Sequence, residues 1–213
     1  MRIWWLAALT LMLAACGNKP RQPDWLVDAD GSQDRFQRAY LRGDERVASA
    51  EFTRLMRQLS STGDPKLIAR GELTRCAVQV ASLVFDECAG FERLRADAPA
   101  EERAYADFLA GRLPADRANL LPEAYRGVAT GGAFDARKLE SPLSRLVAAG
   151  VLVRTGRADP QVMLAASEVA SEQGWRRAVL SWLGARAILA EKAGNTEEAQ
   201  RLRRRMALAA ETR

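Results

Sequence analysis

Glycines and prolines divide most of this 213-residue chain into helix-length segments. At Asp64, Ser141 and Asp159 a helix-capping side chain stands directly before a proline, which is typical of an N-cap followed by the first helical residue. Six glycines close the segments, because glycine adopts the left-handed conformation in which many helices end. These glycines are Gly43, Gly63, Gly111, Gly156, Gly174 and Gly194. The pattern predicts helices near 33–42, 45–59, 65–82, 99–110, 142–155, 160–173, 175–193 and 196–210.

Short connections between these segments predict how the helices pack. Several neighbours are joined by only one to five residues, so they have to run antiparallel. No segment alternates apolar and polar residues as strands do. Apolar residues instead recur at helical spacing, as at Val47, Phe52, Leu55 and Leu59. The chain is therefore predicted to be all-α, with stacked antiparallel helical hairpins.

Two stretches resemble the tetratricopeptide repeat. In GDERVA at 43–48, followed by Phe52, a glycine, a small residue and an aromatic residue match the signature between that family's two helices. The run 194–199 repeats the glycine and alanine spacing. The resemblance implies an α-solenoid whose concave face binds a partner. The tryptophan and tyrosine positions of the repeat are largely unfilled, so an irregular helical bundle is the alternative.

The N-terminus has the anatomy of an export signal. Arg2 precedes an apolar run of thirteen residues, 3–15, whereas a helix needs about 20 apolar residues to span a membrane. Residues 13–16, LAAC, resemble the lipobox of bacterial lipoproteins. The resemblance implies that the signal peptide 1–15 is removed and that Cys16 carries a covalent lipid, the only attached group expected. Gly17, where retention at the inner membrane calls for aspartate, implies the outer membrane.

The rest of the chain is predicted to comprise a tether and one domain. Residues 16–24 contain two prolines and two cations without apolar periodicity, as a lipidated tether should. Residues 25–213 are expected to form one α-helical repeat-like domain. Within it, the glycine-rich stretch 127–140 is either a hinge or a long surface loop.

Cys76 and Cys88 are a candidate disulfide in a compartment that permits such bonds. On one straight helix their Cα atoms would lie about 18 Å apart, far beyond the roughly 7 Å that a disulfide can span. A disulfide therefore requires a turn between them, yet the intervening residues include no glycine or proline. Two buried thiols are the alternative.

The chain has no histidine, which removes the usual general base and the commonest metal ligand. No catalytic residue and no metal ligand is predicted. Paired carboxylates such as Glu101 and Glu102 fall in a predicted first helical turn, where they complement the helix dipole. Glycan cleavage by such carboxylates is the alternative interpretation.

Two groups of residues are candidates for binding a partner. Arg201, Arg204 and Arg205 form a cationic cluster on the last predicted helix, and Trp175 and Trp182 share one helix face. A solvated helix end and core packing are the structural alternatives. The net charge of +5 is mild, and an exported lipoprotein does not normally meet nucleic acid.

Together these patterns predict a lipoprotein anchored on the periplasmic face of the outer membrane. It would bind or scaffold a protein or peptide in envelope assembly or transport. The alternatives are an enzyme that processes cell-wall glycan or peptide through carboxylates, and a fixed structural subunit of an envelope complex. The sequence does not indicate an oligomeric state.

Overall fold

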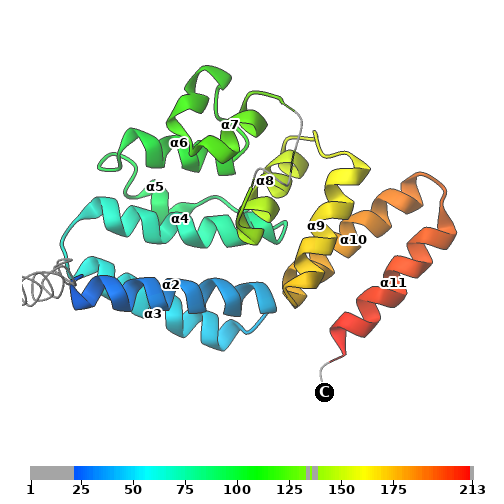
Figure 1. The fold of residues 1–213 in the computed structure, drawn as a ribbon, viewed down its shortest axis with the longest axis horizontal. Helices are drawn as coiled ribbons and strands as arrows, with labels where there is room; N and C mark the ends of the chain where they lie inside the picture. The colour runs from blue at the N-terminus through cyan, green and yellow to red at the C-terminus, as the bar shows by residue number, and fades with distance from the viewer. Residues whose placement is uncertain (1–21, 133–134, 136–138, 212–213) are drawn as a thin grey trace, which may run out of the picture.

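The computed structural model describes residues 22–132, 135 and 139–211, and throughout these residues the chain forms only helices and connecting segments (Figure 1). The all-α prediction is therefore confirmed for the described part of the chain. The predicted signal peptide, Cys16 and most of the predicted tether lie outside it. The elements are α2 (Asp24–Arg42), α3 (Glu45–Ser60), α4 (Pro65–Ala81), α5 (Ala89–Glu92), α6 (Ala100–Leu109), the 3-10 helix η2 (Ala115–Leu120), α7 (Glu123–Ala129), α8 (Pro142–Arg154), α9 (Pro160–Glu172), α10 (Arg176–Lys192) and α11 (Thr196–Ala210).

Side-chain caps fix where several helices begin. The Asp64 carboxylate accepts the backbone N–H of Lys66 at 2.9 Å, and the Asp159 carboxylate accepts that of Val162 at 2.8 Å. Both caps stand before a proline at the first helical position. These bonds satisfy backbone donors that have no partner within the helix. The helix starts predicted at 65, 142, 160 and 196 are therefore confirmed.

Helix α2 begins earlier than predicted, at Asp24 rather than at residue 33. Its first half has its large apolar residues side by side at Trp25, Leu26 and Val27 and also contains Gly31, so it lacks the sustained apolar stripe that would indicate a helix. Only small side chains of this half are buried, Ala29 at 2% exposure and Ser32 at 0%. Ala29 packs with Leu55 and Leu59 of α3, so the packing against α3, and not a local pattern, extends the helix.

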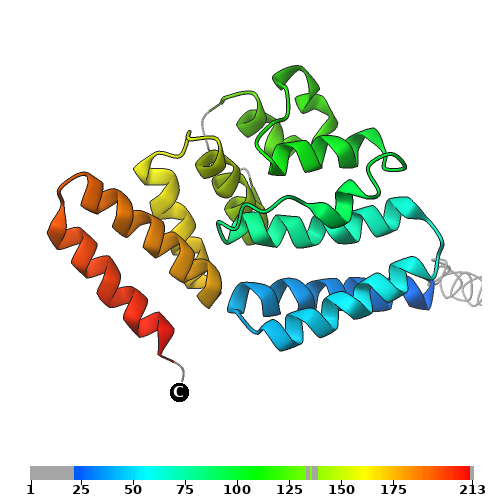
Figure 2. The ribbon, with the colours of Figure 1, turned by 180° about the vertical axis from the view of Figure 1, so that it is seen from behind.

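The helices form an open array in which sequence neighbours pack side by side (Figures 1 and 2). Helices α2 and α3 pair at one end, and α9, α10 and α11 continue from α8 at the other. Helix α4 joins the two groups, since it contacts α2 and α3 as well as α8. The hairpin order is thus interrupted between α4 and α8, where residues 82–141 intervene.

Helices α4 and α8 approach one another closely enough for their backbones to touch. A Cβ atom added at Gly150 of α8 would lie 2.3 Å from the carbonyl oxygen of Val80 in α4. No side chain fits there without separating the helices. Gly150 therefore permits the pairing of two helices that the sequence keeps far apart.

A second long-range contact ties the C-terminal helices to the first hairpin. The Nε of Arg177, on α10, donates to the backbone carbonyl of Tyr40 at 2.7 Å, and the guanidinium lies 4.4 Å from the Tyr40 ring centroid. The same guanidinium forms an ion pair with Glu45 at the start of α3. Arg177 thereby holds α10 against the junction of α2 and α3.

The segment between α4 and α8 covers both helices with short elements. Of its four elements only α6 was predicted, because the others are brief and two of them, η2 and α7, directly follow Pro114 and Pro122. Each is held by a few large buried side chains, namely Phe91, Phe108, Leu121 and Tyr125. Within the stretch 127–140, residues 127–129 complete α7 and Leu139 is buried. Residues 133–134 and 136–138, part of the predicted hinge or loop, lie outside the described residues.

Candidate functional site: a groove between α2, α4, α6, α7 and α8

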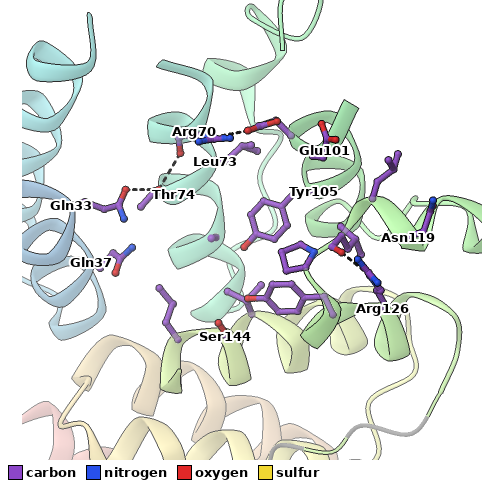
Figure 3. A pocket seen from close by; sticks show the side chains of 18 residues that line it. Gln33, Gln37, Arg70, Leu73, Thr74, Glu101, Tyr105, Asn119, Arg126 and Ser144 are labelled. Atoms are coloured by element: carbon purple, nitrogen blue, oxygen red, sulfur yellow. Dashed lines mark hydrogen bonds and ion pairs between the residues drawn. The ribbon is translucent and has the colours of Figure 1, made fainter. Parts of the chain in front are cut away.

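A groove of about 730 Å³ opens between the helices α2, α4, α6, α7 and α8 and the 3-10 helix η2 (Figure 3). This volume is in the usual range for ligand sites, about 300 to 1,000 Å³. Its apolar surface comes mainly from α4 and α8 and from the residues between η2 and α7, while polar side chains surround it. The lining residues are Gln33, Gln37, Arg70, Leu73, Thr74, Ala77, Glu101, Glu102, Tyr105, Asn119, Leu120, Leu121, Pro122, Tyr125, Arg126, Leu143, Ser144 and Val147.

Two tyrosines occupy the middle of the groove. The ring centroids of Tyr105 and Tyr125 are 5.8 Å apart, and Phe108 packs behind Tyr125 at 5.1 Å. The hydroxyls of Tyr105, Tyr125 and Ser144 lie close enough to influence the titration of the two phenols.

Burial raises the pKa of both phenols, although for Tyr125 the hydrogen bonds with Ser144 and Tyr105 oppose this rise. Since a free tyrosine already titrates near pH 10, both hydroxyls are neutral at physiological pH. The tyrosines can therefore bind a ligand through hydrogen bonds and ring contacts, but they do not act as bases.

At one end of the groove a carboxylate is only partly satisfied. Glu102, in the first turn of α6, has a side chain that is 8% exposed, and its Oε1 lies 2.5 Å from the Nε of Arg70. Its Oε2 is buried and has no hydrogen-bond partner among the residues that the structure describes. Leaving a buried acceptor unpaired costs about 1 to 3 kcal/mol, and such groups in native proteins call for an explanation.

Amide side chains form much of the polar rim. Gln33 and Gln37 lie one helical turn apart and face the groove from α2, while Asn119 lies on the opposite side (Figure 3). Each amide offers both donors and an acceptor. Arg126 lies at the end of the groove away from Arg70, and its Nε donates to the Leu121 carbonyl at 2.9 Å.

The two tryptophans proposed as partner-binding residues lie in the core instead. Trp182 is 0% exposed and its indole N–H donates to the Ala81 carbonyl at 2.9 Å, at the end of α4. Trp175 is 8% exposed. Neither ring presents a surface to a partner, so the binding role predicted for Trp175 and Trp182 is corrected to core packing.

The arginine cluster is at the surface of α11. Arg201 pairs with Glu198, with Nε 2.7 Å from Oε2. Arg203 pairs with Glu191 of α10. Arg204 and Arg205 are exposed and form no ion pair within the described residues. The structure thus leaves these two cations accessible, away from the groove.

Cys76 and Cys88 are joined by a disulfide, with their Cα atoms 5.8 Å apart. The required turn follows the end of α4 and uses Leu83 at φ 58° in place of a glycine. Bonds from Leu83 N to Val80 O and from Val84 N to Gln79 O close this turn. A non-glycine residue in this conformation is uncommon, so no glycine or proline marks this turn in the sequence.

Sequence reasoning did not anticipate the groove. Glu101 and Glu102 were noticed only as a carboxylate pair at a helix start, and no pattern singled out Tyr105, Tyr125 or Arg126. Five separate segments of the chain supply the lining, so no local spacing could indicate it.

Comparison with protein-family models, with curated proteins and with solved structures finds no match to this chain. None of the described helices combines the length and the apolar character that crossing a membrane requires. Among the described residues, no three or more His, Cys, Asp or Glu side chains are grouped so that they could hold a metal ion. The class that the described helices define is an all-α protein of paired helices, and it contains a groove suited to a ligand.

Proposed function

We propose that this chain is a bacterial lipoprotein, anchored by a lipid on Cys16 to the periplasmic face of the outer membrane, that binds a segment of an envelope protein or peptide. The groove is the observation that carries the binding role. Its volume of about 730 Å³ accommodates a few residues of extended chain. The tetratricopeptide-like motifs support a scaffold of this kind, and the LAAC sequence supports the anchor.

The chemistry of the groove suits a polypeptide. An extended chain presents N–H and C=O groups together with side chains, and Gln33, Gln37 and Asn119 can donate to and accept from such a backbone. Leu73, Leu143 and the tyrosine rings supply apolar contact for side chains. This mixture of an apolar surface with a few placed polar groups is typical of ligand sites.

A photo-cross-linker placed at Asn119, an exposed residue of the groove, should capture an envelope polypeptide in intact cells. Filling the groove with Gln37→Trp should reduce the adduct about tenfold, which corresponds to about 1.4 kcal/mol of binding. Gln161→Trp, on the exposed surface of α9, is the matched control and should leave the adduct unchanged. An adduct that survives Gln37→Trp, or no adduct at all, would refute the binding role of the groove.

An enzyme that processes cell-wall glycan or peptide is the second candidate, because both Glu101 and Glu102 line the groove. Carboxylate pairs perform glycan cleavage in many enzymes. Turnover of purified cell-wall fragments that is abolished by Glu101→Gln and by Glu102→Gln would favour this candidate over a binding module. A fixed structural subunit, the third interpretation, would instead be recovered only within a stable complex.

Replacing Cys16 with serine should release the protein from the membrane, because serine cannot form the thioether to lipid. Lipid chains contribute about 0.8 kcal/mol for each buried methylene, so the loss of anchoring should be nearly complete. Fractionation of cells should then show the protein in the soluble periplasm. Gly17→Asp is the control, since it should keep the lipid and shift the protein to the inner membrane. Cys16→Ser protein that stays on membranes would contradict the proposed anchor.

A further inference from the structure

The carboxylate of Glu102 is only partly hydrogen-bonded, so the groove can bind a ligand group that donates hydrogen bonds to it. Its side chain is nine-tenths buried and lines the groove, yet only Oε1 has a partner. We infer that Glu102 binds a primary amine carried by the peptide in the groove, and that this amine takes the place of Arg70 on the carboxylate. The inference rests on the proposed function and specifies the ligand of the same site.

The present partner, Arg70, is suited to being displaced. It is the only residue paired with Glu102 among those described, and it does so through Nε alone. Its side chain is 65% exposed, so it can turn into solvent at little cost. Oε2 is covered from solvent in the structure, and a ligand therefore reaches this carboxylate when Arg70 moves aside.

An ammonium group satisfies the site better than Arg70 does. It is compact and carries three N–H donors, so it can bond both Oε1 and Oε2, whereas the observed contact leaves Oε2 unpaired. The exchange replaces one cation with another, so the buried carboxylate stays compensated. Glu101, exposed beside it and without an ion pair in the described part of the chain, adds negative charge at this end.

The opposite end of the groove carries positive charge. Arg126 lines it, with its Nε held by the Leu121 carbonyl and its terminal nitrogens without an ion pair within the described residues. Tyr105 lies between the two ends (Figure 3). A peptide with its amine at Glu102 can place a carboxylate near Arg126, so the two charges at opposite ends fix the direction in which the peptide lies along the groove.

The test uses the full-length protein purified in detergent and three synthetic probes. The first is an N-acetylated peptide, Ala-Leu-Lys-Leu-Ala, with a free carboxylate; the others carry an acetylated lysine amine or an amidated C-terminus. Calorimetry should show the lysine peptide binding about tenfold more tightly than its acetyl-lysine form. In Glu102→Gln the affinities for the lysine and acetyl-lysine peptides should become nearly equal. The exposed Glu101→Gln should reduce the preference for the lysine peptide without risk to folding. Glu198→Gln, which removes a carboxylate paired with Arg201 outside the groove, should leave this preference unchanged.

Arg70→Gln distinguishes a displaceable partner from a purely structural one. Because it removes the competing cation, it should increase the affinity for the lysine peptide severalfold and leave that for the acetyl-lysine peptide unchanged. Arg126→Gln should make the peptides with a free and with an amidated C-terminus bind with equal affinity, while the preference for lysine over acetyl-lysine persists.

Equal binding of the lysine and acetyl-lysine peptides, no measurable binding of the lysine peptide, or weaker binding after Arg70→Gln would overturn the inference. If the inference fails in this way, a cross-linked adduct at Asn119 that is lost in Gln37→Trp would still support the proposed function. Failure of the inference and failure of the function are therefore distinguishable.

Discussion

Replacing Trp182 with alanine should lower the free energy of unfolding by about 3 to 5 kcal/mol, the usual cost of truncating a large buried aromatic side chain. The indole is completely buried on α10 and its N–H bonds the Ala81 carbonyl at the end of α4, 101 residues earlier in the chain. The substitution removes both the packing and the indole hydrogen bond to that carbonyl. Urea titration followed by circular dichroism measures the loss.

Trp182→Phe separates the two contributions. Phenylalanine keeps most of the packing but leaves the Ala81 carbonyl unpaired, so it should cost about 1 to 3 kcal/mol. Trp25→Ala is a suitable comparison, because Trp25 is only partly buried at the start of α2, and it should cost less than Trp182→Ala. If Trp182→Ala unfolds at the same urea concentration as the unmodified protein, the described core is incorrect.

Removing the Cys76–Cys88 disulfide should lower the free energy of unfolding by about 3 kcal/mol, since the closed loop of roughly a dozen residues restricts the unfolded chain. The bond holds the start of α5 against α4. It therefore also stabilises the segment whose helices α6 and α7 line the groove. The measurement is urea unfolding of the Cys76→Ala/Cys88→Ala double variant.

A reducing agent provides the internal control for this prediction. It should destabilise the unmodified protein by a similar amount and leave the double variant unaffected. Protein exported through the natural route should show no thiol at Cys76 or Cys88 that reacts with an alkylating reagent before reduction. Reactive thiols in that sample would instead support the alternative of two buried free cysteines.

Much of the secondary structure could be predicted because its signals are local. Asp64, Asp159 and Asn195 each cap the turn that immediately follows them, and the glycine at position 43 takes a positive φ of 84° where α2 ends. Short connections then forced neighbouring helices into hairpins. Such features act over a few residues and are visible in any short window of sequence.

The first half of α2 and the elements α5, η2 and α7 were not predictable in this way. Their local sequences are short, rich in proline or without a sustained apolar stripe, and their stability comes from burial against other helices. Ala29, Phe91 and Tyr125 are each buried, but only the folded chain brings their partners together. Tertiary packing thus overrides weak local preference.

The candidate site depended even more on tertiary contacts. Gly150 allows α8 to touch α4, and this pairing brings Leu143, Ser144 and Val147 to the same groove as Arg70 and Thr74. The sequence left both a surface and a core position open for Trp175 and Trp182, because a shared helix face does not say what covers it. Only the packed structure decided between the two.

The sequence by itself determined the helical class, most helix boundaries and the expectation of an exported, lipidated chain. Each of these follows from the order of residues within one or two helical turns or within the N-terminal segment. The tertiary structure decided the α4–α8 pairing, the turn at Leu83 that brings Cys76 to Cys88, and the groove with its unpaired Glu102 oxygen. These features join residues that are far apart in the chain, and their energies depend on burial and close approach, which exist only once the helices are packed.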